Sequence, residues 1–110
     1  MDKFSALSEP TRRSILEILA REGKLSATQI YERFEISPSA ISQHLKILRD
    51  ANVVHVEKKA QQRLYVLNQD AVAEVEDWAK KMTRLWEQRF DALEEVIEAE
   101  KINFINRKDE

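Results

Sequence analysis

The sequence predicts a mainly α-helical protein that carries one small β-hairpin and ends in a long helix. Three observations lead to this fold class. Apolar residues recur at helical spacing through most of the 110 residues. Two β-rich runs, at 53–57 and 63–67, flank a polar link and predict a hairpin. A helical pattern then continues from about 69 to 102. A chain of this length fits a single domain over 1–110.

Two helices are expected before residue 25. Phe4 and Leu7 belong to a short first helix that packs on the common core. Pro10 suits the first position of the next helix, and either Ser8 or Glu9 suits the residue that begins it. Gly23 is the only glycine of the chain, and it suits the left-handed residue just past a helix end.

A helix-turn-helix is predicted between about residues 26 and 50. Ser26 and Gln29 have the spacing of a capping box, which begins a helix of about nine residues. Ser37 and Pro38 are a good N-cap and a good first helical residue, so they begin a second helix. Only a turn of about three or four residues then separates the two helices, which is the helix-turn-helix arrangement.

The second helix of this pair, at 38–50, has a polar outer face. Ile41, Leu45 and Leu48 line its inner side at spacings of four and three residues. The outer positions carry no carboxylate before Asp50. The helix is therefore expected to enter a DNA major groove, where Gln pairs with adenine and Ser with several bases. The residues assigned to DNA here are Ser37, Ser39, Ala40, Ser42, Gln43 and Lys46.

The predicted hairpin, or wing, at 53–67 has a cationic tip. Its link contains two lysines and no glycine, so the turn type stays open. A cationic hairpin beside a recognition helix suits phosphate or minor-groove contact, and an ordinary solvated hairpin is the alternative. The residues assigned to DNA in the wing, 54–67, are Lys58, Lys59, Gln61, Gln62 and Arg63.

The last predicted helix has an apolar stripe that its own domain cannot cover. Some thirty helical residues extend roughly 45 Å, whereas a domain of this length is about 27 Å across. A second copy of the chain is the simplest partner for a stripe rich in Trp and Phe, and an apolar ligand is the alternative. The residues expected at a dimer interface are Phe4, Leu7, Val75, Trp78, Met82, Leu85, Trp86, Phe90 and Leu93.

The charges of the chain are divided between its two halves. Residues 1–66 hold 11 Lys and Arg against 8 Asp and Glu, whereas residues 67–110 hold 7 against 12. The acidic half is expected to face away from DNA phosphate. The absence of cysteine excludes disulfides and thiolate metal sites. Because neither a membrane-length apolar run nor a signal peptide is visible, a cytoplasmic location is expected.

The histidines and two early arginines have less specific patterns. His44 is expected to be half-buried and locally hydrogen-bonded, and His55 to lie on the surface, where it could contact phosphate. For Arg12 and Arg13, DNA contact and a salt bridge are both open. No nucleophile–base spacing, paired carboxylates or Gly-rich phosphate loop is visible, so an enzyme is not expected.

Several stretches resemble the ArsR/SmtB family of winged helix-turn-helix repressors. The resemblance covers about residues 4–68 and is closest in the recognition helix. The matching segments are 7–16 (LSEPTRRSIL), 25–30 (LSATQI), 37–54 (SPSAISQHLKILRDANVV) and 63–68 (RLYVLN). The final helix, with Trp78 and Trp86, is similar to that of a metal-independent subgroup. Asn52, after the recognition helix, and Ala60, at the wing tip, stand where relatives often have Gly.

The resemblance implies a homodimer that binds an imperfect palindrome near a promoter, usually as a repressor. Many relatives release DNA when they bind a metal. In one metal site of the family, cysteines occupy the positions of Ser26 and Thr28, whose hydroxyls are poor ligands for soft metals. Another metal site of the family uses carboxylates and histidines on the final helix, which has no histidine here. No metal or other cofactor is therefore expected, and a small-molecule or protein inducer stays unidentified. A protein-interaction module without sequence-specific DNA binding is the alternative function.

Overall fold

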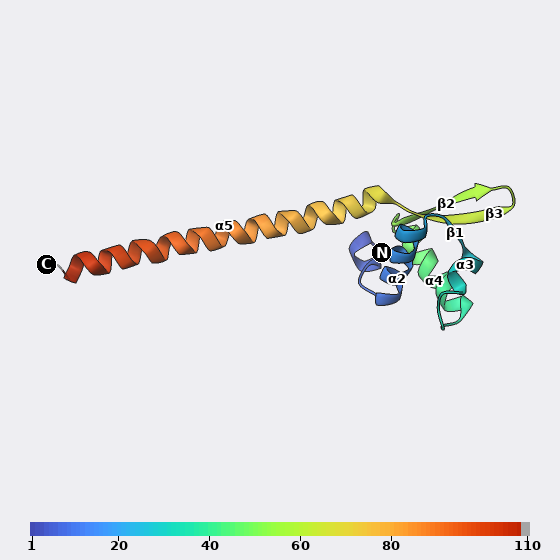
Figure 1. The fold of residues 1–110 in the computed structure, drawn as a ribbon, viewed down its shortest axis with the longest axis horizontal. Coiled ribbons are helices and arrows are strands. Elements are labelled where there is room, and N and C mark those ends of the chain that lie inside the picture. The colour runs from blue at the N-terminus through green and yellow to red at the C-terminus, as the bar shows by residue number, and fades with distance from the viewer. Residues whose placement is uncertain (109–110) are drawn as a thin grey trace. The chain divides into compact units, whose positions relative to one another are not determined.

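The computed structural model describes residues 1–108, and the chain divides into two compact units. The first unit is Met1–Val75, and the second begins at Glu76. The helices are α1 (Lys3–Ala6), α2 (Pro10–Glu22), α3 (Ala27–Tyr31), α4 (Pro38–Asp50) and α5 (Gln69–Lys108), and the strands are β1 (Leu25–Ser26), β2 (Val54–Lys59) and β3 (Gln62–Leu67) (Figure 1). The predicted fold class, mainly helical with a small hairpin and a long final helix, is confirmed. The expectation of a single domain stays a prediction.

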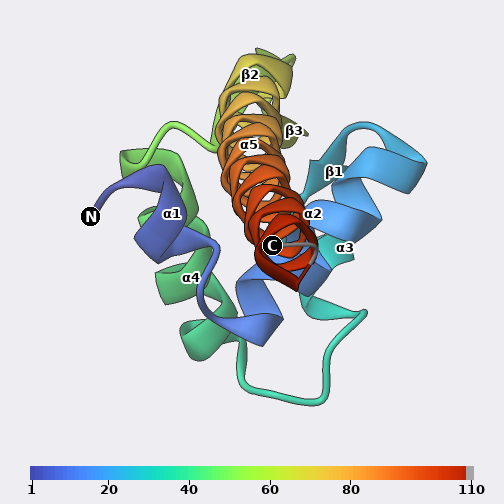
Figure 2. The same ribbon diagram turned by 90° about the vertical axis from the view of Figure 1, so that its left-hand side faces the viewer.

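One apolar core holds the first unit together. Helices α1 and α2 both pack against α4, and α1 lies beside it in Figure 2. The sheet contacts both helices, with β3 against α2 and β2 against α4. Fully burying a Leu or Ile side chain stabilises a fold by about 1.5–3 kcal/mol. The largest fully buried side chains are Ile15, Leu19, Ile30, Ile41, Leu45, Leu48, Val53 and Val54.

The predicted start and stop signals of α2 are confirmed. The carboxylate of Glu9 accepts a hydrogen bond from the backbone N–H of Arg12 at 3.0 Å, and Pro10 is the first helical residue. The helix ends at Gly23, whose φ of 88° is favourable only for glycine. Local chemistry alone therefore sets both ends of this helix.

Helix α3 is shorter than predicted. Its capping box is present, because Ser26 accepts from the Gln29 backbone and the Gln29 side chain accepts from the Ser26 backbone. The expected nine residues are wrong, since the helix ends at Tyr31. The N–H groups of Arg33 and Phe34 bond three residues back, to Ile30 and Tyr31. The chain thus tightens into turns before it reaches α4, and the connection at 32–37 is longer than expected.

The hairpin belongs to a three-stranded antiparallel sheet with the order β1-β3-β2. Leu25 pairs with Tyr65, so β1 adds a short edge strand that the sequence analysis did not predict. The wing strands are longer than expected, and only Ala60 and Gln61 remain in the turn (Figure 1). A positive φ, 58°, occurs at Ala60 and not at Gln61, which is typical of a type II′ turn.

Asn68 joins the end of α4 to the start of α5. Its side-chain amide donates to the backbone oxygen of Asn52 at 2.7 Å, and its backbone N–H donates to Val53 at 2.9 Å. Its side-chain oxygen accepts from the N–H of Asp70 at 3.2 Å. Asn52 has the left-handed conformation expected from the sequence, with φ 61°. The end of α4 is thus tied to the first turn of α5.

The rest of α5, from Glu76, forms the second unit. The helix continues to Lys108 rather than to about 102, because Phe104 and Ile105 prolong its apolar pattern. Its 40 residues extend about 60 Å at the usual helical rise. Charged side chains interrupt the apolar ones throughout, and no helix within residues 1–108 is long and apolar enough to cross a membrane.

Ala60→Gly is expected to stabilise the protein. An alanine in the left-handed region is unfavourable by about 1–2 kcal/mol, whereas glycine adds about 0.5–1 kcal/mol of unfolded-state entropy. The free energy of unfolding should therefore rise by about 0.5–1 kcal/mol, measured by thermal and urea denaturation.

Gln61→Gly is the matched control for this substitution. Gln61 has no positive φ, so the same replacement should lower stability by about 0.5–1 kcal/mol. Equal destabilisation by both variants would contradict the strain assigned to Ala60.

Candidate nucleic-acid interface

Helix α4 presents a polar face to solvent. Ile41, Leu45 and Leu48 are at most 1% exposed, which fixes the rotation of the helix on the core. The exposed positions on the other side are Ser39, Ser42, Gln43 and Lys46, and Ala40 is half-buried beside them. No carboxylate occurs from residue 36 to 49. This face can therefore approach a polyanion without charge repulsion.

Ser37 has a defined structural role at the start of α4. Its hydroxyl accepts a hydrogen bond from the backbone N–H of Ala40 at 3.2 Å, so it is the N-cap that the sequence predicted. Pro38 occupies the first helical position. Ser37 therefore fixes where the polar face begins, and its assignment to DNA stays a prediction.

Tyr31 joins the polar face of α4, and the sequence analysis missed it. Its hydroxyl lies 2.6 Å from the hydroxyl of Ser42. Tyr31 is the last residue of α3, and its ring packs against the core. The turn between α3 and α4 brings Tyr31 to Ser42. The only sequence signal for this contact is a tyrosine near the end of an amphipathic helix.

The wing concentrates cations at its tip. Lys58 pairs directly with Arg63 across the strands, and Lys59 pairs with Gln62. All four side chains are exposed, and no ion pair joins Lys58, Lys59 or Arg63 to a described carboxylate. Like charges placed directly opposite one another repel. The tip is therefore ready to bind an anion.

Closer to the core, the wing carboxylate is already neutralised. Lys24 lies 2.5 Å from Glu57, and its hydrogen bond and charge hold the pKa of the Glu57 carboxyl below its usual value. His55 is exposed, as expected, and lies 3.7 Å from Glu57. The one carboxylate in this hairpin therefore has a local partner and does not cancel the charge of the tip.

Arg12 lies inside the fold rather than on the exposed polar face of α4. It is only 7% exposed. Its guanidinium donates to the backbone oxygen of Ala6 at 2.6 Å and of Ser5 at 3.3 Å. Arg12 is thus buried by its own fold, and no ion pair joins it to a described carboxylate. Arg13 is exposed and donates to the backbone oxygen of Leu7 at 2.7 Å.

His44 connects Arg12 to the recognition helix. Its Nδ1 atom is 3.3 Å from the Arg12 guanidinium and therefore accepts, and the ring is half-buried as expected. Glu9 lies 3.8 Å from the same nitrogen. Desolvation tends to raise the pKa of Glu9, but hydrogen bonds from the Arg12 and Thr11 backbone outweigh it and lower the pKa. The cluster fastens α4 to α1 and α2.

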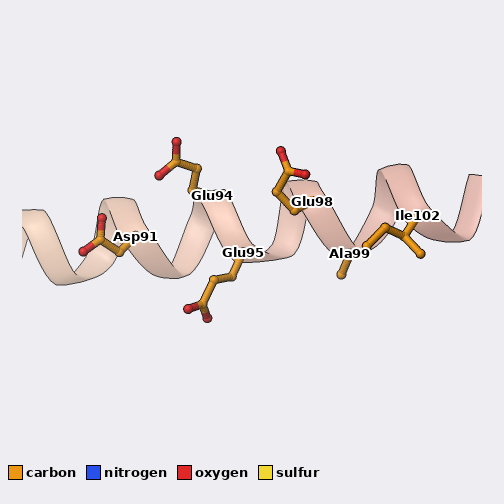
Figure 3. Close-up of a pocket in the computed structure, with 6 residues that line it drawn as sticks. All are labelled: Asp91, Glu94, Glu95, Glu98, Ala99 and Ile102. Carbon is orange, nitrogen blue, oxygen red and sulfur yellow. The ribbon is translucent and has the colours of Figure 1, made fainter.

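The carboxylates of α5 do not converge on a common point. Figure 3 shows Glu94 and Glu98 on one side of the helix and Glu95 on the opposite side. These residues, with Asp91, line an open hollow along the second unit. Within residues 1–108, no group of three or more His, Asp or Glu side chains could hold a metal ion. Their arrangement is that of a solvated helix face.

The predicted dimer residues belong to three elements. Phe4 lies in α1, Leu7 is its C-cap, and Val75 lies in the part of α5 that belongs to the first unit. Phe4 and the remaining positions on α5 are exposed in the single chain. These α5 positions are Trp78, Met82, Leu85, Trp86, Phe90 and Leu93. Their assignment to an interface stays a prediction.

Comparison with known proteins identifies the family. Residues 9–56 match the family model described as "Bacterial regulatory protein, arsR family". The transcriptional repressor SdpR of Bacillus subtilis is 41% identical over 75 residues, which cover 68% of this chain and 82% of that protein. The chain belongs to the ArsR family. It is a DNA-binding transcriptional regulator.

Further relatives agree with this ArsR-family assignment. The arsenical resistance operon repressor of Bacillus subtilis is 40% identical over 70 residues, which cover 64% of this chain and 67% of that protein. The solved structure of an ArsR-like transcriptional regulator from Rhodococcus sp. RHA1 superposes with a TM-score of 0.75, at 27% identity, over 84% of this chain and 87% of that one. The protein-interaction alternative is not favoured by these relatives.

Arg12→Ala is expected to destabilise the first unit. The variant leaves the buried backbone oxygen of Ala6 without its guanidinium donor and removes a partner of His44. An unsatisfied buried acceptor is unfavourable by about 1–3 kcal/mol. The free energy of unfolding in urea should fall by that amount.

Arg13→Ala is the control, because Arg13 is exposed and makes a surface hydrogen bond. Its effect should stay within about 0.5 kcal/mol. If the two substitutions have equal effects, Arg12 does not brace the fold.

Proposed function

We propose that this ArsR-family regulator is a dimeric repressor that binds a palindromic operator. Two copies of α4 would enter successive major grooves, about one DNA turn apart. The exposed, carboxylate-free face of α4, with Ser39, Ser42 and Gln43 at its centre, is the observation that carries this proposal. Repression is the function printed in the names of two relatives, and a bound dimer would block transcription.

Base and phosphate contacts are assigned to different residues. Gln43 has two hydrogen-bonding groups on one planar amide, which matches the edge of adenine in the major groove. Lys46, one turn further along α4, suits a phosphate at the groove edge. The exposed side chains of Lys58, Lys59 and Arg63 would contact backbone phosphates or the adjacent minor groove.

The apolar stripe of α5 supports dimerisation. Trp86 is 66% exposed and Phe90 57% exposed in the single chain. Contiguous apolar surface of this kind normally marks an interface. Part of the stripe repeats every 11 residues, at Val75, Trp86 and Ile97. Such a repeat corresponds to about 3.67 residues per turn, which favours two α5 helices that pair with a right-handed supercoil.

We also propose that the protein belongs to the metal-independent part of the family. The chain has no cysteine, and the hydroxyl of Ser26 is engaged as the cap of α3. Thr28 is exposed but offers only a hydroxyl, which binds soft metals poorly. Titration with Zn²⁺ or arsenite should therefore leave the DNA affinity unchanged. An inducer of another kind is compatible with this proposal.

Gln43→Ala is expected to weaken specific binding much more than non-specific binding. A bidentate amide–adenine contact is worth about 1–3 kcal/mol of discrimination, which corresponds to roughly 5- to 150-fold in affinity. The site would be selected from random DNA with the wild-type protein. Fluorescence anisotropy on that site and on a scrambled duplex then measures both affinities. Equal losses on the two duplexes would remove Gln43 as a base reader.

Lys58→Ala is the contrasting variant in the same assay. It should weaken binding to both duplexes alike. The slope of log affinity against log salt should become shallower by about 0.9 for each phosphate contact that is lost. An unchanged slope would remove Lys58 from the phosphate contacts. Failure of the wild-type protein to select any sequence would contradict the operator proposal itself.

Met82→Glu is expected to convert the dimer to a monomer. The substitution places a carboxylate within the exposed apolar stripe of α5, where burial of a charge in an interface is strongly unfavourable. Sedimentation equilibrium measures the oligomeric state, and operator binding should weaken in parallel.

Gln88→Glu adds the same charge to the same helix, about 120° around its axis from Met82. It should leave the dimer intact. A dimeric Met82→Glu variant would show that the stripe is not the interface.

A further inference from the structure

The contact between Tyr31 and Ser42 is a side-chain hydrogen bond between the two helices of the helix-turn-helix. Their hydroxyl oxygens lie 2.6 Å apart, which is a normal distance for a strong O–H···O bond. Tyr31 is half-buried, with its ring on the core, whereas Ser42 is exposed on the polar face of α4. The bond therefore joins an anchored group to one of the predicted base readers.

A serine inside a helix has another option for its hydroxyl. It can turn back and donate to the backbone carbonyl four residues earlier. Thr83 does this in α5, where its hydroxyl donates to the Ala79 oxygen at 3.1 Å. The corresponding acceptor for Ser42 would be the Pro38 carbonyl, yet its hydroxyl bonds to Tyr31 instead. The hydrogen bond with the phenol thus holds the Ser42 oxygen beside Tyr31, whichever of the two hydroxyls donates.

The paired hydroxyls retain capacity for a ligand. Each hydroxyl has one donor and two acceptor positions. One donor and one acceptor are used between them, so the pair keeps one donor and three acceptor positions. That set can donate to a purine N7 or a thymine O4, or accept from an exocyclic amine.

We propose that Tyr31 is a positioning residue for sequence-specific DNA recognition, which orients Ser42 toward a base edge. This inference rests on the proposed function, because it assumes that α4 lies in the major groove. It assigns to α3 a part in choosing the base sequence. If the Tyr31–Ser42 hydrogen bond only held α3 and α4 together, its loss would change the stability of the fold and not the DNA affinity.

A double-mutant cycle tests this proposal. Tyr31→Phe keeps the ring and removes only the hydroxyl, and Ser42→Ala removes its partner. Tyr31→Phe should weaken binding to the selected site by about 3- to 10-fold, the range expected for one hydrogen bond. Binding to a scrambled duplex and the salt slope should not change. The double variant should bind no more weakly than Ser42→Ala, because Tyr31 acts through Ser42.

Selection from random DNA gives a second readout. The Tyr31→Phe protein should lose its base preference at one position of each half-site and keep it at the others. Tyr65→Phe is the matched control, because Tyr65 lies in β3 between Leu25 and Val56 and is not assigned to DNA, so the variant should leave the selected sequence unchanged.

Three results would overturn the inference while leaving the proposed function standing. The first is an unchanged affinity and selected sequence for Tyr31→Phe. The second is additive losses in the cycle, and the third is equal losses on both duplexes. If the wild-type protein selects no sequence at all, the proposed function fails and this inference fails with it.

Discussion

Burial of the inner side of α4 is the constraint on which the exposed polar face of this helix depends. Ile41, Leu45 and Leu48 are almost completely inaccessible to solvent, so any rotation of the helix would expose them or open voids. Their spacing leaves Ser39 and Gln43 on the side away from the core. Hydrophobic packing thus decides which residues of α4 face solvent, and these outer side chains can serve recognition because they contribute little to the core.

Hydrogen bonds then remove the remaining freedom of this helix. Ser37 caps its first turn, His44 connects its middle to the buried Arg12, and Asn68 holds the Asn52 backbone at its end. Each bond is worth only about 0.5–1.5 kcal/mol. Their value lies in position, because they brace the helix at three points along its length. A recognition helix that is braced in this way loses little further entropy when it binds.

The sequence predicted what local chemistry decides. Glycine and proline favour helix ends whatever the tertiary context, so Gly23 and Pro38 made it possible to predict the end of α2 and the start of α4. The edge strand at Leu25 could not be predicted, because two residues show no periodicity and the strand exists only through its pairing with β3. The burial of Arg12 was also invisible. Arginine is ordinarily exposed, and the partners of Arg12 include a histidine 32 residues away. The contact of Tyr31 with Ser42 likewise depends on how the turn between two helices folds.

The wing tip combines two features that a hairpin without a ligand would not favour. Ala60 has a left-handed backbone where glycine would relax it, and Lys58 faces Arg63 directly. Local rules of this kind are usually broken at functional sites. A DNA phosphate beside Lys58 and Arg63 would attract both cations. Part of the binding free energy would then come from removing the repulsion between Lys58 and Arg63 that exists in the protein without DNA. The same arrangement would let a chain of net charge −2 bind DNA, because the cations of the wing tip have no ion-pair partner among residues 1–108, whereas Glu57 nearby is neutralised by Lys24.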